Sequence, residues 1–214
     1  NTVYFLPNSD ARQSQIYFYI PMGDYNREEN VRREAFNQYI SGGFSGLIMN
    51  EIREKNSMAY TAYGFASSRG LPGAQTYFSG YIGTQNDKAV DAIDLYMKLL
   101  TDMPERPGRI DNIKSYLRQS ALTDHPDSRN LSLRIAEWKR RGYTDDPAKE
   151  ELPLIDSLTF PDIVDYYQKN IKGKPIIIGV LGNPKDISID ALKKFGKVIR
   201  LNEKKLFNEK DTMF

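Results

Sequence analysis

Apolar and polar residues alternate along two early stretches of the chain, with the period of half-buried β-strands. Residues 15–20 (QIYFYI) place isoleucine and phenylalanine on one face and tyrosine on the other. Pro21 and Gly23 come directly afterwards and predict the end of that strand. Residues 3–7 (VYFLP) predict a shorter apolar strand before it.

A second pair of strands is predicted at residues 59–68 and 75–84, where small or aliphatic residues alternate with aromatic ones. Residues 69–73 between them (RGLPG) combine a proline with two glycines, which is typical of a tight turn. The two strands are therefore predicted to pair as an antiparallel hairpin.

Helices are predicted where apolar residues recur every three or four positions. The clearest pattern spans residues 87–102, and polar residues just before it offer N-cap chemistry. Its expected buried stripe is Val90, Ile93, Met97 and Leu100, and its expected caps are Thr84, Asn86 and Asp87. Further helices are expected over residues 27–41, 45–55, 109–122, 128–141, 148–157, 160–170 and 188–195, and further strands over 175–182 and 197–201.

This order of elements shows no regular alternation of strand and helix, so a doubly wound parallel sheet is not expected. It predicts an α+β fold with a mostly antiparallel sheet and helices packed on one face. Residues 1–202 are predicted to form a single domain, and residues 203–214 a charged tail that frays.

Composition narrows the class of protein. The 30 basic and 28 acidic residues are well mixed and give a net charge of +2, which does not favour nucleic-acid binding. No apolar run approaches the about 18 residues that a membrane span needs. The absence of cysteine excludes disulfides, thiol catalysis and cysteine zinc sites, and fits the cytoplasm and the bacterial periplasm equally well.

Residues 42–60, GGFSGLIMNEIREKNSMAY, are the most informative segment. Together with the hairpin, the helix DKAVDAIDLYMKLL and the block LTFPDIVDYYQKNIKGKPIIIGVLGNP, this segment resembles the C-terminal half-domain of the insulysin/pitrilysin zinc-peptidase family, which includes mitochondrial processing peptidase. The chain departs from the family pattern twice. Ser45-Gly46 stands where the family usually has Ser-Arg, and Ser57 stands where it usually has glycine.

The resemblance implies the non-catalytic half of a two-part metalloendopeptidase that cleaves extended peptides. In that family one half supplies the zinc, and the other contributes an arginine and a tyrosine to the substrate. On this sequence those residues are Arg53 and Tyr60. The expected partners are a catalytic half-domain, in the same longer chain or in another subunit, and a peptide substrate. The alternative is a catalytically dead scaffold subunit of the same family.

The chain itself has no set of zinc ligands. A catalytic zinc site commonly uses three protein ligands that include histidine. The only histidine is His125, and Pro126 disfavours a helical conformation there. The family's H-x-x-E-H motif is absent, and the helix expected to carry it starts at Arg27 with no histidine. No cofactor is therefore expected in this chain, and zinc is expected in the partner half.

Structural roles compete with each functional interpretation. Arg53 can cap its helix or pair with Glu51 or Glu54, and Tyr60 can pack in the sheet. The acidic pairs Asp145-Asp146 and Glu150-Glu151 offer acid–base groups but fall in a stretch that is expected to be exposed. The tyrosine-rich strand faces can stack nucleic-acid bases, although packing beneath helices or lining a protein groove is the commoner role.

Overall fold

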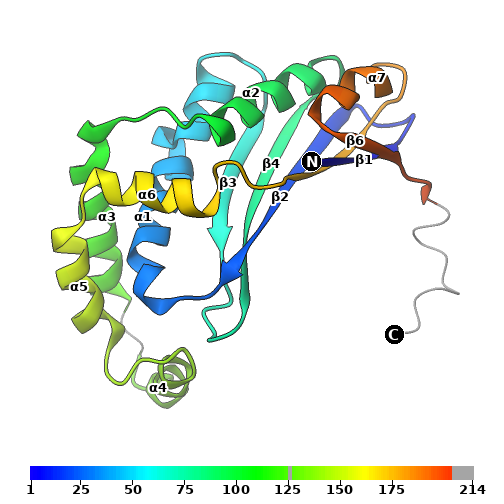
Figure 1. The fold of residues 1–214 in the computed structure, drawn as a ribbon. Coiled ribbons are helices and arrows are strands. Elements are labelled where there is room, and N and C mark those ends of the chain that lie inside the picture. Colours follow the sequence, from blue (N-terminus) through cyan, green and yellow to red (C-terminus); the bar gives the residue numbers. More distant parts are fainter. Residues whose placement is uncertain (125–126, 204–214) are drawn as a thin grey trace, which may run out of the picture.

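The computed structural model describes residues 1–124 and 127–203. His125 lies outside the described residues, and so does the predicted tail, 203–214, except for Glu203. Within that part, six strands form one sheet in the order β3-β4-β2-β5-β1-β6 (Figure 1). The strands are β1 (Thr2–Pro7), β2 (Gln13–Asp24), β3 (Thr61–Ser67), β4 (Gln75–Gln85), β5 (Ile177–Gly182) and β6 (Lys197–Arg200).

The pairing of the strands confirms the α+β fold class. The pairs β3–β4, β4–β2 and β2–β5 are antiparallel, whereas β1 runs parallel to both β5 and β6. The predicted hairpin is β3–β4, and its register sets Thr61 opposite Gly83. This register brings the residues that follow β4 close to those that precede β3, which decides the position of the candidate site.

Strand β2 is longer than predicted. It continues through Pro21 to Asp24, with a register shift against β4 between these two residues. A proline has no N–H for the sheet, but it is tolerated at a bulge. The predicted strand end at Pro21 was therefore wrong, because the irregularity accommodates the proline.

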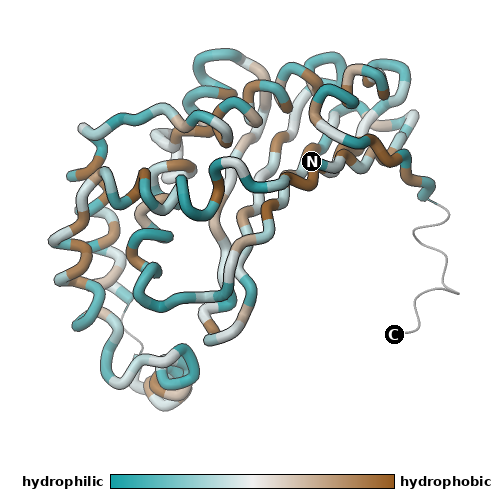
Figure 2. Tube along the Cα trace, viewed as in Figure 1, coloured by the Kyte–Doolittle hydropathy of each residue, from teal (hydrophilic) through white to brown (hydrophobic). Residues whose placement is uncertain are grey.

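The helices lie on one face of the sheet, as predicted (Figure 1). Helices α1 and α2 contact the strands, and α6, α3 and α5 pack around α1, while α4 lies at the periphery. The helices are α1 (Asn30–Ser41), α2 (Ala89–Thr101), α3 (Ile110–Thr123), α4 (Leu131–Arg140), α5 (Pro147–Ser157), α6 (Phe160–Asn170) and α7 (Ile189–Leu192). In Figure 2 apolar and polar positions alternate along the strands, and the segment between β2 and α1 is largely hydrophilic.

Tyr96 is the central core residue of α2. Its ring stacks on Phe18 with centroids 4.1 Å apart, and its hydroxyl donates a hydrogen bond to the Tyr63 carbonyl oxygen at 2.9 Å. The ring fits because Gly64 and Gly80 have no side chain there: a Cβ on either would lie 2.4 or 2.1 Å from the Tyr96 oxygen. The predicted stripe is only partly right, because Ile93 and Leu100 are buried with Tyr96, whereas Val90 and Met97 are half-buried.

The predicted cap of α2 was wrong. No side chain caps the 3₁₀ turn Asn86–Lys88 that leads into the helix. The buried Asn86 side chain instead accepts a hydrogen bond from the Ser14 hydroxyl at 2.7 Å and donates one to the Ala11 carbonyl oxygen at 2.8 Å. Thr84 donates to the Met58 carbonyl oxygen. Both side chains bind distant segments, which no local pattern reveals.

The helices of residues 1–124 and 127–203 leave the opposite face of the sheet uncovered, and aromatic side chains gather on it. Tyr63, Tyr81 and Tyr17 lie in one row across three strands, with ring centroids 5.3 and 5.1 Å apart. Tyr19 and Tyr77 stack in a neighbouring row at 5.4 Å. Of the two commoner roles expected for these residues, packing beneath helices is therefore excluded, and lining a protein groove stays a prediction. They lie on the face away from the helices because β2 and β4 turn their isoleucines and phenylalanines toward the helices.

Candidate functional site

The segment from α1 to β3 reverses direction within a few residues. Gly43 adopts a φ of 60°, a conformation that favours glycine. Gly46 lies so close to the end of α1 that a Cβ there would be 2.7 Å from the Cα of Ser41. On this backbone a larger residue at position 46, such as the arginine of the family pattern, would clash with the end of α1.

The second helix is widened into a π-helix, η3 (Met49–Glu54), in which the Lys55 N–H donates to the Asn50 carbonyl oxygen at 3.0 Å. The predicted apolar stripe of Leu47, Ile48 and Ile52 is confirmed, because all three are fully buried. Arg53 directly follows the buried Ile52 and has a side chain that is 44% exposed. Single π-helical turns of this kind occur frequently at functional sites.

Ser57 ends this helix in the left-handed region, with a φ of 51°. Its N–H donates to the Arg53 carbonyl oxygen at 2.9 Å, and the Met58 N–H donates to the Ile52 carbonyl oxygen at 2.9 Å. Glycine is the residue that adopts this conformation without steric cost, and the family pattern usually has glycine here. The left-handed turn directs the chain from η3 into β3.

Tyr60 lies directly before β3, and its N–H donates to the Gly83 carbonyl oxygen at 2.9 Å. Its side chain does not pack in the sheet; it is 52% exposed. The Gln85 amide donates a hydrogen bond to the Tyr60 hydroxyl oxygen at 3.1 Å. Since this oxygen already accepts a bond from Gln85, the tyrosine O–H remains available as a donor.

Arg53 and Tyr60 line the same surface pocket, which has a volume of about 340 Å³. The structure therefore brings together the two residues that the resemblance singled out. The other lining residues are Glu54, Ser57, Met58, Ala59, Thr84, Gln85 and Lys88. Sequence reasoning missed Gln85 and Lys88, because only the β3–β4 register places the end of β4 and the turn after it beside Tyr60.

Arg53 has a weak ion-pair partner. Its Nε lies 3.7 Å from a Glu54 carboxylate oxygen, and both side chains are about half exposed. The other predicted partner, Glu51, pairs instead with Arg106 and with Lys55, which lies 2.9 Å away. An exposed pair between adjacent residues holds the guanidinium loosely. The terminal nitrogens of Arg53 make no hydrogen bond to the described part of the chain and can donate to a ligand.

The described residues offer no place for a zinc ion. Within residues 1–124 and 127–203, no three histidine, cysteine, aspartate or glutamate side chains are grouped so that they could hold a metal ion. The helix that the resemblance aligns with the zinc motif carries Asn30, Arg33 and Glu34, of which Arg33 is a cation. Any zinc chemistry must therefore use residues outside the described part of this chain.

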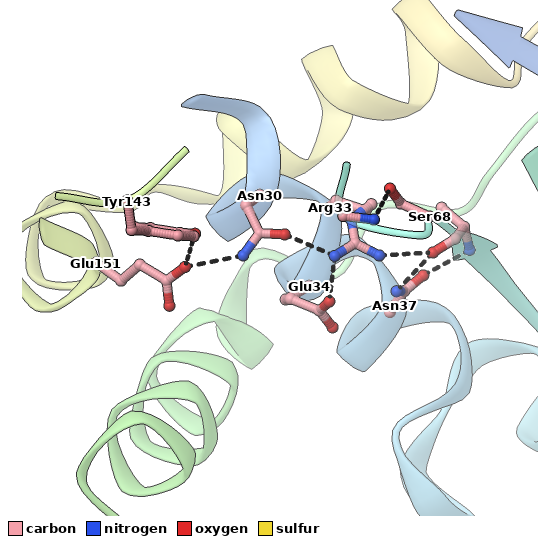
Figure 3. Close-up of polar contacts among 9 residues, drawn as sticks. Asn30, Arg33, Glu34, Asn37, Ser68, Tyr143 and Glu151 are labelled. Atoms are coloured by element: carbon pink, nitrogen blue, oxygen red, sulfur yellow. Dashed lines mark hydrogen bonds and ion pairs between the residues drawn. The ribbon is translucent and has the colours of Figure 1, made fainter. Parts of the chain in front are cut away.

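Helix α1 instead carries a polar network that fastens it to its neighbours (Figure 3). A Glu151 carboxylate oxygen accepts hydrogen bonds from the Tyr143 hydroxyl at 2.7 Å and from the Asn30 amide at 2.9 Å. Arg33 donates to Asn30 at 2.6 Å. Burial, and then the bond to Glu151, raises the pKa of Tyr143 far above its usual value.

The network corrects one expectation about the acidic pairs. Glu150 and Glu151 are not simply exposed; Glu150 pairs with Arg27 at 2.7 Å, and Glu151 joins α5 to α1. Asn37 extends the network to the sheet edge, where its side chain accepts from the Ala66 N–H at 2.7 Å and donates to the Ala66 carbonyl oxygen at 3.1 Å. These side chains therefore hold the helix on the sheet.

Residues 2–108 match the family model described as the peptidase M16 inactive domain. This match covers half of the chain, so the protein is a domain of a peptidase family, of the type described as inactive. The chain belongs to the peptidase M16 inactive-domain family, which confirms the resemblance found in the sequence. A search of curated proteins finds no match.

Solved structures show the same fold. A peptidase M16 inactive domain from Pseudomonas fluorescens is 16% identical with a TM-score of 0.71, and the match covers 85% of this chain and 43% of that one. The periplasmic protease PqqL from Escherichia coli is 16% identical with a TM-score of 0.64, and the match covers 84% of this chain and 20% of that one. A chain of complex III2 from Candida albicans is 12% identical with a TM-score of 0.65, at 93% and 49% coverage. This chain thus spans less than half of each of these proteins.

None of the helices in the described residues is long and apolar enough to cross a membrane.

Proposed function

We propose that this domain is the substrate-contacting, non-catalytic half of a two-part zinc metalloendopeptidase that cleaves extended peptides. The observation that carries the proposal is that Arg53, from η3, and Tyr60, directly before β3, line one pocket with donors left free. The zinc, the nucleophilic water and the general base belong to a partner half.

The donors suit a peptide carbonyl. A guanidinium presents fixed N–H groups and keeps its charge, and the Tyr60 hydroxyl adds a second donor on a rigid ring. Donors that point to the oxygen of a scissile carbonyl stabilise the negative charge that develops there. Gln85 holds the tyrosine oxygen, so it is a positioning residue for this contact.

The uncovered aromatic face supports the need for a partner half. Tyr17 is 50% exposed, and Tyr63 and Phe65 are 38% and 39% exposed, on strands β2 and β3. Contiguous exposed apolar patches of this kind mark interaction surfaces in soluble proteins. The share of the related structures that this chain spans is consistent with a longer protein that supplies the covering surface.

The test is peptide hydrolysis by the longer natural protein, with and without a zinc chelator. Tyr60→Phe and Arg53→Gln should each lower kcat/KM by about tenfold to a hundredfold, the loss expected for one charged or oxyanion-directed hydrogen bond. Tyr116→Phe is the matched control, because Tyr116 is equally exposed at 52% but lies on α3 away from the pocket. It should leave kcat/KM unchanged.

Two outcomes contradict the proposal. Equal kcat/KM values for Tyr60→Phe and Tyr116→Phe would show that the Tyr60 hydroxyl does not contact the substrate during catalysis. A longer protein that shows no chelator-sensitive hydrolysis at all would instead indicate the scaffold alternative.

A further inference from the structure

The pocket that holds Arg53 and Tyr60 carries more positive charge than a peptide carbonyl requires. Lys88 lines it together with Arg53, and among the residues that the structure describes Glu54 is the only acidic one that lines it. We infer that, if the proposed function holds, this pocket selects peptides that present a carboxylate there, either an acidic side chain or the C-terminal carboxylate.

Lys88 has donors to spare. Its ammonium group donates one hydrogen bond, to the Ser57 carbonyl oxygen at 3.3 Å. An ammonium group has three N–H donors, so a single long bond to a carbonyl leaves capacity for a ligand. The contact with Ser57 also keeps the lysine against the wall of the pocket, beside the turn that connects Arg53 to Tyr60.

Glu54 does not cancel the two cations. It approaches Arg53 only at Nε, at 3.7 Å, and its side chain is 52% exposed. Asp87 is a neighbour of Lys88 in sequence, but it is exposed and does not line the pocket. The lining side chains therefore keep a net charge of about +1, and the groups that point to a ligand are mainly donors.

The start of the helix adds to this preference. The helical segment that continues into α2 begins at Asn86, and no side-chain hydrogen bond caps it at Gln85. Gln85, which precedes this turn, and Lys88, which ends it, both line the pocket. The uncapped N–H groups of a helix N-terminus favour a negative charge nearby. A carboxylate in the pocket thus has Arg53 and Lys88 as lining cations, and the helix begins beside it.

The experiment measures the binding of fluorescent peptides to the longer natural protein, with zinc removed by a chelator so that the peptides stay intact. Three peptides of one sequence are compared. The first has glutamate and an amidated C-terminus, the second has glutamine and an amidated C-terminus, and the third has glutamine and a free C-terminus. Either carboxylate peptide should bind about fivefold tighter than the neutral one, and the glutamate and C-terminal arms tell the two sources apart.

Variants test whether the preference comes from this pocket. Lys88→Met should reduce the preference to about one, and Lys88→Arg, which keeps the charge, should retain it. Lys98→Met is the matched control on the same helix, where Lys98 pairs with Asp94 at 2.9 Å, and it should keep the full preference. Thermal unfolding of each variant checks that the fold is intact.

The inference is overturned if all three peptides bind within twofold of one another, or if Lys88→Met keeps the preference. If Tyr60→Phe then weakens all three peptides equally, the proposed function stands without the charge preference. If none of the peptides binds, both are refuted.

Discussion

Ser57 offers the sharpest test of how the backbone positions this pocket. It is the one residue other than glycine in the described part of the chain with a positive φ, 51°. The left-handed region costs about 1–2 kcal/mol for a residue with a Cβ. Glycine avoids this cost but loses about 0.5–1 kcal/mol through its greater freedom in the unfolded chain. Ser57→Gly should therefore raise the free energy of unfolding by about 0.5–1 kcal/mol.

Ser57→Gly changes few other contacts, so the estimated change in the free energy of unfolding needs no further correction. The Ser57 side chain is exposed, and its backbone N–H and carbonyl, which bond to the Arg53 carbonyl oxygen and to Lys88, are kept in glycine. For a chain of this length, the change corresponds to an increase in Tm of about 1–4 °C. The assay is urea denaturation followed by circular dichroism, with thermal unfolding as a second measure.

The matched control is the same substitution in ordinary helical backbone. Ser115 is exposed in the middle of α3, so Ser115→Gly should lower the free energy of unfolding by about 0.5 kcal/mol. The opposite signs of the two substitutions are the result that matters. If Ser57→Gly destabilises the domain as Ser115→Gly does, the left-handed turn carries no strain, and the account of the missing family glycine is wrong.

Two further predictions concern the core. Gly80→Ala should destabilise the fold by about 2–5 kcal/mol, because the new methyl group displaces Tyr96 and breaks its hydrogen bond to the Tyr63 carbonyl oxygen. Gly23→Ala is the control, because Gly23 in β2 has open space around it, and it should change stability by less than about 0.5 kcal/mol. Urea denaturation of both variants measures the difference. Burial raises the pKa of Tyr96 and of Tyr167, so their contribution to stability is complete below the unfolded value near pH 10 and falls as the pH rises above it. Urea midpoints measured from pH 7 to pH 11 should be level at first and then drop, and midpoints that stay level to pH 11 would contradict the burial argument.

The local pattern of the sequence determined much of the fold. Period-two alternation predicted the β3–β4 hairpin, and the apolar stripe of Leu47, Ile48 and Ile52 predicted the buried side of the second helix, because both depend only on which side chains avoid water. The motif that ends at Tyr60 also predicted Arg53 and Tyr60 as candidate contact residues, and counting histidines predicted that this chain lacks the family's zinc ligands.

Other features depend on residues that are distant in the sequence. Tyr96 enters the core because two glycines on neighbouring strands leave space for its ring, and Asn86 leaves its expected cap to bind Ser14 and Ala11. The π-helical turn likewise has no signal in the apolar pattern, and the positive φ at Ser57 is hinted at only by the glycine of the family pattern.

The pocket itself combines both sources of information. The sequence supplied the arginine and the tyrosine, whereas the register of two strands placed Gln85 and Lys88 beside them. Register follows from side-chain packing across the whole sheet, so a sequence pattern along one strand cannot fix it. The sequence by itself therefore determined the family and the two candidate contact residues, and only the tertiary structure decided their neighbours and the charge around them.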